Sequence, residues 1–494
     1  MSFSAKYIPL SFITKDVEIF KQIINTIIIK SFIDDKCSTT TLEYYIQGTQ
    51  YGYNDSAKND GRNKFLRISD ITDGMVDWDS VPFCNCKDES TYLLEDNDIV
   101  IARTGGTTGK SFMIVNPPKS SIYAGYLIRV RAKKDVNPVF LQCFFNSYLY
   151  WNQIVSLNSG EFRPSINSKK LAALEMPLFS QHIQNLIVKL CQEEISEEYA
   201  TIKNTTDKFR QSFEHIKAIH SEIAIQKETV SQLKQTILQN AIQGKLTAEW
   251  RKEHPAEEPA SELLKRIKLE KQQMIASGKL KKEKPLEPIN PEEIPFEIPK
   301  SWTWCRLGEA GCFVRGKGFL KSDFTPSGYP CLHYGQIHMK FNICTYNNLT
   351  FIPEGLAPKS SIAFTNDIIL AITSEDEAGS CKPVAWLGDF PIAVGAHTAI
   401  YKHNMNPMYL SYYYSCKCFD KQKRQYTHGS KVIEMTPGDI ATILVPIPPL
   451  SEQQEIVRRI DAIMNTVNSL ENQISESERT SEELLKAIVG EVMG

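Results

Sequence analysis

The sequence lacks the features that mark a zinc protein or a membrane protein. Its 12 cysteines include no Cys-x-x-Cys pair, and Cys84-x-Cys86 and Cys416-x-Cys418 are too closely spaced for the usual zinc ligands. The apolar run Ile23–Ile29 is too short to cross a bilayer, and its flanks are not those of a signal peptide. We therefore expect reduced thiols, no bound metal and a cytoplasmic location.

The sequence also lacks a charge excess of either sign. Its 56 basic and 58 acidic residues leave a formal net charge of −2 at pH 7. This balance does not indicate a nucleic-acid partner, and it does not exclude one, because a mosaic surface can still present one basic face. With 494 residues, the chain is long enough for two or three domains.

Two segments carry the apolar periodicity of long helices. Residues 181–244 have an apolar residue at every seventh position and no internal proline or glycine. In residues 452–492 the apolar positions alternate by four and three. A second apolar row in the first segment fades at Gln226 and Lys227, where a kink or a change of partner is a possible outcome. The repeating apolar residues are Val188, Ile195, Ile202, Phe209, Ile216, Ile223, Val230 and Ile237 in the first segment, and Ile456, Ile460, Ile463, Val467, Leu470, Ile474, Leu484 and Ile488 in the second.

A period of 3.5 residues predicts a seam that faces another helix and supercoils with it. Because one chain contains two such seams, we predict that they pack against each other as a coiled coil. The alternative is that each seam binds another protein.

Two other parts of the chain repeat each other at a constant distance of 269 residues. Asn97-Asp98-Ile99 matches Asn366-Asp367-Ile368, and Asn137-Pro138 matches Asn406-Pro407. The same offset holds from Asn97 to Pro177, which matches Pro446, and a constant offset over about eighty residues indicates two copies of one domain. The chain is therefore predicted to follow the order globular domain, helix, globular domain, helix.

The globular parts mix strand and helix patterns, which predicts an α+β fold. Residues 98–102, 367–371, 112–115 and 126–130 are predicted strands, and residues 139–151 and 408–419 are predicted helices. We place the first globular domain at 1–180, a long helix at 181–244, a linker with a short helix at 245–298, the second globular domain at 299–450, and a second long helix at 451–494.

Two short motifs suggest an enzyme. Thr104–Ser111 follows a predicted strand and resembles a phosphate-binding P-loop, but it has threonine where the tight turn needs glycine, and its copy Thr373–Lys382 is acidic. Asn116–Lys119 resembles the Asn-Pro-Pro-aromatic motif of adenine methyltransferases, with lysine in place of the aromatic residue that stacks on a flipped base. We predict a strand-end loop and a turn at these places, with no catalytic residue and no cofactor. A DNA adenine methyltransferase or a P-loop NTPase is the alternative.

Basic residues with hydroxyl or aromatic neighbours recur at corresponding places in the two copies. One such cluster is usually a solvated surface, but recurrence favours a nucleic-acid contact, since phosphate is bound by Lys, Arg, Ser, Thr and amide donors. The candidate DNA-binding residues are Tyr51, Arg103, Thr104, Lys110, Arg163 and Lys169 in the first copy, and Lys317, Thr373, Lys382, Ser430 and Lys431 in the second.

Three stretches carry a resemblance to a known family. They are Leu233–Leu246 with the following Thr247–Arg251, Ile298–Gly308, and Pro446–Glu455; Phe65–Ile71 and Thr49–Tyr53 add to them. In these stretches the chain resembles the specificity subunit of a Type I restriction–modification system. The first forty residues depart from the family because they lack the Pro-x-x-Trp-x-Trp opening present at Pro299–Trp304.

The resemblance implies two target-recognition domains separated by antiparallel helices, with no catalysis by this chain. It implies double-stranded DNA, two methyltransferase subunits and restriction (translocase) subunits as partners, and no membrane. The target is then a bipartite, asymmetric DNA sequence. Helix length is expected to set the gap, so removing Ile202–Lys208 with a matched segment of the second seam should narrow it by about three base pairs. A coiled-coil scaffold without a DNA role is a third hypothesis.

Overall fold

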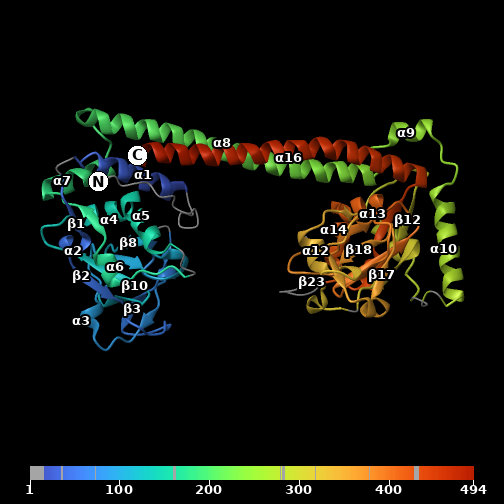
Figure 1. The fold of residues 1–494 in the computed structure, drawn as a ribbon, viewed down its shortest axis with the longest axis horizontal. Coiled ribbons are helices and arrows are strands. Elements are labelled where there is room, and N and C mark those ends of the chain that lie inside the picture. The colour runs from blue at the N-terminus through green and yellow to red at the C-terminus, as the bar shows by residue number, and fades with distance from the viewer. Residues whose placement is uncertain are drawn as a thin grey trace. The chain divides into compact units, whose positions relative to one another are not determined.

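The computed structural model describes residues 16–34, 37–72, 74–159, 163–278, 280, 284–317, 319–377, 379–427 and 433–493. The chain divides into two compact units (Figure 1): unit 1 comprises Met1–Ile223 with Glu476–Gly494, and unit 2 comprises Ala224–Ser475. Each unit combines helices with sheets, which confirms the predicted α+β class. Within the described ranges, no helix is both long and apolar enough to cross a membrane.

Unit 1 is built around a four-stranded antiparallel sheet with the strand order β2-β10-β7-β8. Strands β6, β3 and β9 form a smaller sheet, and helices α1, α4, α5 and α7 bury their apolar faces together in the main core. The elements up to α7 are α1 Asp16–Lys30, β1 Thr39–Thr41, α2 Leu42–Tyr45, β2 Ile46–Tyr51, β3 Asn63–Leu66, β4 Ile71–Thr72, β5 Met75–Val76, β6 Phe83–Cys84, α3 Glu89–Tyr92, β7 Ile99–Ala102, β8 Ser111–Met113, β9 Ser121–Tyr123, β10 Leu127–Ala132, α4 Pro138–Phe145, α5 Tyr148–Leu157, α6 Ser168–Ala172, β11 Glu175–Pro177 and α7 Gln181–Gln192.

Unit 2 has a five-stranded sheet, β13-β22-β18-β20-β15, and a four-stranded sheet, β16-β14-β21-β17. Helices α13 and α14 pack on the first of these sheets. The elements after α7 are α8 Ala200–Ile242, α9 Ala248–Glu253, α10 Ala260–Ala276, β12 Thr303–Arg306, α11 Leu307–Ala310, β13 Gly311–Arg315, β14 Tyr329–Leu332, α12 Tyr334–Met339, β15 Cys344–Thr345, β16 Thr350–Ile352, β17 Ser361–Ala363, β18 Ile368–Ala371, β19 Thr373–Ser374, β20 Lys382–Trp386, β21 Ile392–Val394, β22 Thr398–His403, α13 Pro407–Tyr414, α14 Lys417–Lys423, β23 Ile433–Glu434, α15 Pro437–Thr442, β24 Leu444–Ile447 and α16 Leu450–Met493.

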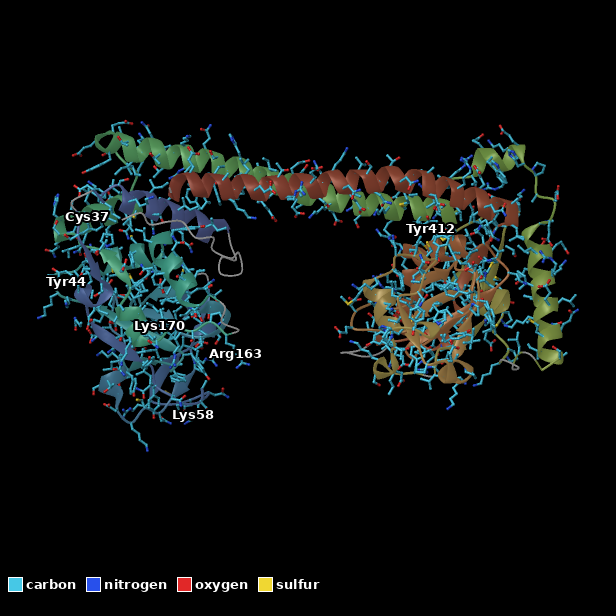
Figure 2. All side chains as sticks on the ribbon, viewed as in Figure 1. Cys37, Tyr44, Lys58, Arg163, Lys170 and Tyr412 are labelled. Carbon is cyan, nitrogen blue, oxygen red and sulfur yellow. The ribbon has the colours of Figure 1, made fainter. Side chains whose placement is uncertain are left out.

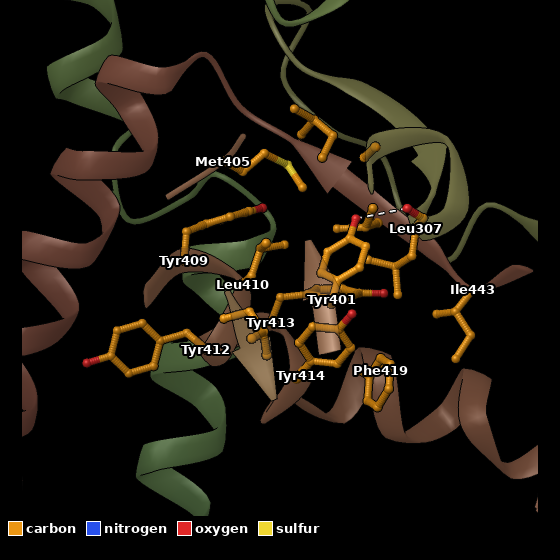
Figure 3. Close-up of a cluster of buried hydrophobic side chains, with 14 of the residues drawn as sticks. Leu307, Tyr401, Met405, Tyr409, Leu410, Tyr412, Tyr413, Tyr414, Phe419 and Ile443 are labelled. Carbon is orange, nitrogen blue, oxygen red and sulfur yellow. Dashed lines mark hydrogen bonds between the residues drawn. The ribbon is translucent and has the colours of Figure 1, made fainter. Parts of the chain in front are cut away.

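The core of unit 2 is rich in tyrosine (Figure 3). Tyr401 donates its hydroxyl to the carbonyl of Leu307 at 2.8 Å, and Tyr409 donates to the carbonyl of Pro446 at 2.7 Å. Both side chains are fully buried. A buried hydroxyl needs such a partner, because leaving it unpaired would cost the full desolvation penalty. These bonds therefore tie the sheet and α13 to α11 and β24.

The predicted strands at 98–102 and 367–371 are confirmed as β7 and β18, both buried at every position. The predicted helices 139–151 and 408–419 are each two helices, α4 and α5, and α13 and α14. The polar Asn146-Ser147 pair interrupts the first, and Ser415-Cys416 interrupts the second. The apolar residues of both helices in each pair contribute to the same core. The sequence pattern therefore looked like one continuous helix.

The single helix predicted for 181–244 is wrong in its first third. Helix α7 ends at Gln192, Glu193 is extended with φ −111° and ψ 171°, and α8 begins only at Ala200. The reason is packing: Ile187 and Leu190 of α7 are buried in the globular core of unit 1. Helix α8 itself runs through residues 226 and 227 without a break.

The long helices pack along each other in opposite directions, as predicted. In unit 2, Lys234 of α8 donates to Glu471 of α16 at 2.6 Å, and Arg459 donates to the carbonyl of Leu246 at 2.9 Å. Positions rise in one segment while they fall in the other, which defines an antiparallel pair. The buried seam residues are Ile202, Phe209, Ile216, Ile223, Val230 and Ile237 in α8, and Ile456, Ile460, Val467 and Ile474 in α16; the predicted seam residues Leu470 and Leu484 are instead 41% and 46% exposed.

The internal repeat extends to hydrogen bonds. Asn97 and Asn366 both adopt the left-handed conformation, with φ of 67° and 76°. Gln184 and Gln453 occupy matching places, and their Oε1 atoms accept from the amides of the matching asparagines before α4 and α13 at 3.1 and 2.9 Å. Each also donates from Nε2 to the carbonyl five residues earlier, at 3.0 and 2.9 Å. The two units therefore share one hydrogen-bonded frame.

Candidate nucleic-acid interface

Tyr51, Arg103 and Tyr126 lie together at one end of the central sheet of unit 1. Tyr51 ends β2, Arg103 follows β7, and Tyr126 precedes β10. Because β10 lies between β2 and β7 and is antiparallel to both, these three positions lie at the same end of the sheet. The guanidinium carbon of Arg103 is 4.7 Å from the centre of the Tyr51 ring, and the Arg103 amide donates to the Tyr126 carbonyl at 3.0 Å.

A second segment joins this edge through backbone pairing. Thr104 forms an antiparallel bridge with Ser165. The segment also carries Arg163, and Lys169 follows on α6; both side chains are exposed. Figure 2 shows Arg163 and the neighbouring Lys170 on the surface of this unit. The structure thus gathers Tyr51, Arg103, Thr104, Arg163 and Lys169 around one end of the sheet, as exposed or partly exposed groups.

The loop after β7 does not have the geometry of a P-loop. A P-loop connects a strand to a helix whose first amides help to hold the phosphates. Here residues 104–110 lead into β8, which is the antiparallel neighbour of β7. Half-buried Lys110 closes this hairpin, because the Ala102 amide donates to its carbonyl at 2.9 Å. Asn116, with φ 45°, lies in a turn after β8, as predicted.

In unit 2, Thr373 and Lys382 both contact His338. The His338 Nε2 is 3.2 Å from the Thr373 carbonyl, and the Lys382 ammonium donates to the His338 carbonyl at 3.1 Å. Burial lowers the pKa of Lys382. The ammonium group of Lys382 therefore makes a contact within the protein, whereas Arg163 in unit 1 is exposed.

Lys317 lies at the same sheet end. It is exposed and follows β13, whose antiparallel pairing with β22 brings it beside the start of β22, next to His397. Its amide donates to the carbonyl of Val394 at 3.1 Å. Ser430 and Lys431 lie outside the described residues.

Sequence reasoning missed the aromatic residues at this end of unit 2. The ring of Tyr334 lies 5.3 Å from that of His397 and 6.1 Å from that of His338. His397 is exposed, has φ 66°, and places Nδ1 3.2 Å from the Thr373 hydroxyl. Positive φ in a residue other than glycine costs conformational energy and is often found at functional sites.

His397 holds the place in unit 2 that Tyr126 holds in unit 1. Its carbonyl accepts from the Ile372 amide at 3.0 Å, as the Tyr126 carbonyl accepts from Arg103. The sequence repeat did not reveal that His397 corresponds to Tyr126, because the offset between β10 and β22 is 271 rather than 269 residues. In the described part of the chain, no group of three or more His, Cys, Asp or Glu side chains is placed to hold a metal ion.

The stretches that carried the family resemblance meet at one buried carboxylate, away from the exposed groups above. The side chain of Glu452, at the start of α16, is 2% exposed. It accepts hydrogen bonds from Trp302 Nε1 at 2.8 Å, from the Thr247 hydroxyl at 2.7 Å and from Arg251 Nε at 2.8 Å. This Glu452 cluster joins the end of α8, the entry to β12 and the start of α16, so these motifs hold the scaffold together.

Comparison with known proteins finds a matching domain model and similar chains. Residues 299–477 match the model of the Type I restriction modification DNA specificity domain. The chain is 33% identical over 272 residues to the Type I restriction enzyme EcoAI specificity subunit of Escherichia coli, an alignment that covers 53% of this chain and 44% of that protein. This alignment therefore spans less than half of the relative's length.

Two further relatives extend over most of the chain. The Type I restriction enzyme EcoDI specificity subunit of Escherichia coli is 22% identical over 452 residues, covering 88% of this chain and 84% of that protein. The solved HsdS subunit from Thermoanaerobacter tengcongensis is 15% identical, covers 93% of this chain and 97% of its own, and gives a TM-score of 0.39. The matched domain, the curated relatives and the sequence motifs together lead to one conclusion: the chain contains a Type I restriction modification DNA specificity domain and is similar to Type I restriction enzyme specificity subunits.

Proposed function

We propose that this chain recognises a bipartite, asymmetric DNA sequence for a Type I restriction–modification complex and catalyses no reaction itself. One target-recognition domain lies within about residues 1–180 and the other within about residues 299–450, the boundaries expected from the sequence. The observation that carries the proposal is that the two units have the same hydrogen-bonded framework but different residues at the same end of the sheet. Matching hydrogen bonds build both units, but the same sheet end carries Arg103 and Tyr126 in one and Ile372 and His397 in the other.

In this proposal the exposed cations hold the DNA backbone. Arg163 and Lys169 extend from the segment that pairs with the sheet end, where a guanidinium or an ammonium group can meet phosphate oxygens. Thr104 and the loop amides add neutral donors at the same edge. Lys382 is a weaker candidate for this role, because its ammonium group already donates to the carbonyl of His338.

The proposed partners follow from the family. They are double-stranded DNA, two methyltransferase subunits and restriction (translocase) subunits, acting in the cytoplasm. The antiparallel pair formed by α8 and α16 supports a spacer role for these helices. The alternative of a methyltransferase or NTPase would require tight binding of S-adenosylmethionine or ATP, which isothermal titration of the purified chain would detect.

The test compares DNA affinity at several salt concentrations. Replacing Arg163 or Lys169 with alanine should weaken binding to all sequences and reduce the slope of log K against log salt by about 0.9 for each lost phosphate contact. Lys265→Ala is the matched control, since this lysine is 72% exposed on α10, outside the proposed interface. Slopes that stay at the wild-type value in both interface variants would remove these residues from the DNA contact.

A further inference from the structure

Arg103 differs from the exposed Arg163 and Lys169 because its side chain is held in place. Its guanidinium lies against the Tyr51 ring at 4.7 Å and donates from Nη1 to the carbonyl of Gly125 at 3.4 Å. Its Nε is buried and has no hydrogen-bond partner in the described part of the chain. The Tyr51 hydroxyl in turn accepts from the Ser168 amide at 2.9 Å, which fixes the ring beneath the guanidinium.

The fixed guanidinium borders an open hollow. This hollow has a volume of about 340 Å³ and is lined by Tyr51, Gly52, Asn54, Arg103, Thr104, Gly125 and Tyr126. Tyr126 is 67% exposed at its rim. None of the ion pairs between described residues includes Arg103, so no carboxylate among the described residues competes for its charge there.

These features suit a base edge better than a phosphate. A phosphate contact needs only a nearby charge, and long mobile side chains supply it. Reading a base needs fixed geometry, and the planar fork of arginine matches the O6 and N7 acceptors of guanine in the major groove. Stacking on an aromatic ring holds that fork in one orientation before DNA arrives, which reduces the entropy lost on binding.

We propose that Arg103, oriented by Tyr51, recognises a guanine in the half-site that unit 1 contacts. Unit 2 cannot make this contact in the same way. The residue that matches Arg103 is Ile372, which is fully buried, and the exposed positions nearby include Lys317, His397 and Tyr334. The proposal rests on the proposed function, and it explains by named side chains why the two half-sites differ.

The experiment selects bound duplexes from a randomised DNA library with the full chain and its Arg103→Lys, Arg103→Ala and His397→Ala variants. Wild-type protein should enrich two short half-sites, one with an invariant guanine. Arg103→Lys keeps the charge but loses the fork, so it should lower the preference for that guanine by roughly 5- to 150-fold and leave the other half-site unchanged. His397→Ala should leave the guanine unchanged.

The outcomes separate this inference from the proposed function. If wild-type protein enriches no sequence, both the proposed function and the role of Arg103 are refuted. If it enriches two half-sites and Arg103→Lys still selects the same guanine, only the base contact is refuted. If Arg103→Ala weakens all sequences equally and lowers the salt slope by about 0.9, Arg103 is a phosphate contact instead. Melting curves of Arg103→Lys that match wild type will show that the fold is kept.

Discussion

Replacing Glu452 with alanine should destabilise unit 2 more than most single substitutions would. The change removes a buried carboxylate that accepts from Trp302, Thr247 and Arg251 and leaves the guanidinium of Arg251 without its anionic partner. Removing one member of a buried ion pair typically costs about 3–5 kcal/mol, because the remaining charge loses its compensation. The side chain of Arg251 is 21% exposed, so water can partly replace the carboxylate, and we expect about 3 kcal/mol.

A conservative variant separates charge from shape. Glu452→Gln keeps the length of the side chain but presents an amide group to one of three donors, so one donor is left unsatisfied. That should cost about 1–3 kcal/mol. In a double-mutant cycle, Glu452→Ala and Arg251→Ala should be non-additive by about 0.5–3 kcal/mol, since each removes the same contact.

The assay is denaturant unfolding of the full chain, followed by hydrogen exchange in β12 and the first turns of α16, which report on unit 2. Glu249→Ala is the matched control. This glutamate lies two residues from Arg251 and forms an ion pair with Lys252 in which both side chains are at least 70% exposed. Such pairs contribute about 0–1 kcal/mol. If Glu452→Ala changes the unfolding free energy no more than Glu249→Ala does, the Glu452 cluster is not an anchor of the fold.

Two further perturbations test the cores of the two units. Burial lowers the pKa of His403 to about 3, so between pH 6.5 and 3 the unfolded chain binds one more proton than the folded chain; unfolding free energy should fall by up to about 1.4 kcal/mol per pH unit on acidification. His403→Asn should lose this slope, and parallel pH curves for the two proteins would contradict the assignment. Phe209→Ala removes a 2%-exposed ring that stacks on Phe20 at 5.8 Å and should cost unit 1 about 3–5 kcal/mol by thermal unfolding, whereas Gln211→Ala, exposed on the same helix, should cost less than about 0.5 kcal/mol.

Periodicity and repetition predicted the elements whose residues carry their own signal. The buried strands β7 and β18 and the seam of α8 were visible because each apolar residue faces one environment along the whole element. Helix α7 was joined wrongly to α8 because Val188 and Ile195 are apolar for a different reason, contact with the globular core. The sequence alone does not tell whether an apolar residue packs against another helix or against a sheet.

The candidate site was predicted only in part, for a related reason. Arg103, Thr104 and Tyr51 were found because they are basic, hydroxyl or aromatic residues near predicted strand ends, and the structure brings them together. Tyr126 and His397 were missed because their equivalence depends on strand pairing, which a fixed sequence offset does not reveal. The sequence also could not reveal that the ammonium group of Lys382 donates to the carbonyl of His338, because that contact is a tertiary feature.

The matching glutamines, Gln184 and Gln453, have a consequence for how such a chain can change. Each ties a helix start to the segment that follows the last strand of its unit, and neither contact involves the loops at the sheet end. The spacing between the units is 269 residues at β7 and β18 but 272 at β8 and β20, so the loop after β18 is three residues longer. The hydrogen bonds of both glutamines are present despite this difference in loop length. Loops of different length at this end are therefore compatible with the same hydrogen-bonded frame, so the loops can change while the contacts that fold each unit stay the same.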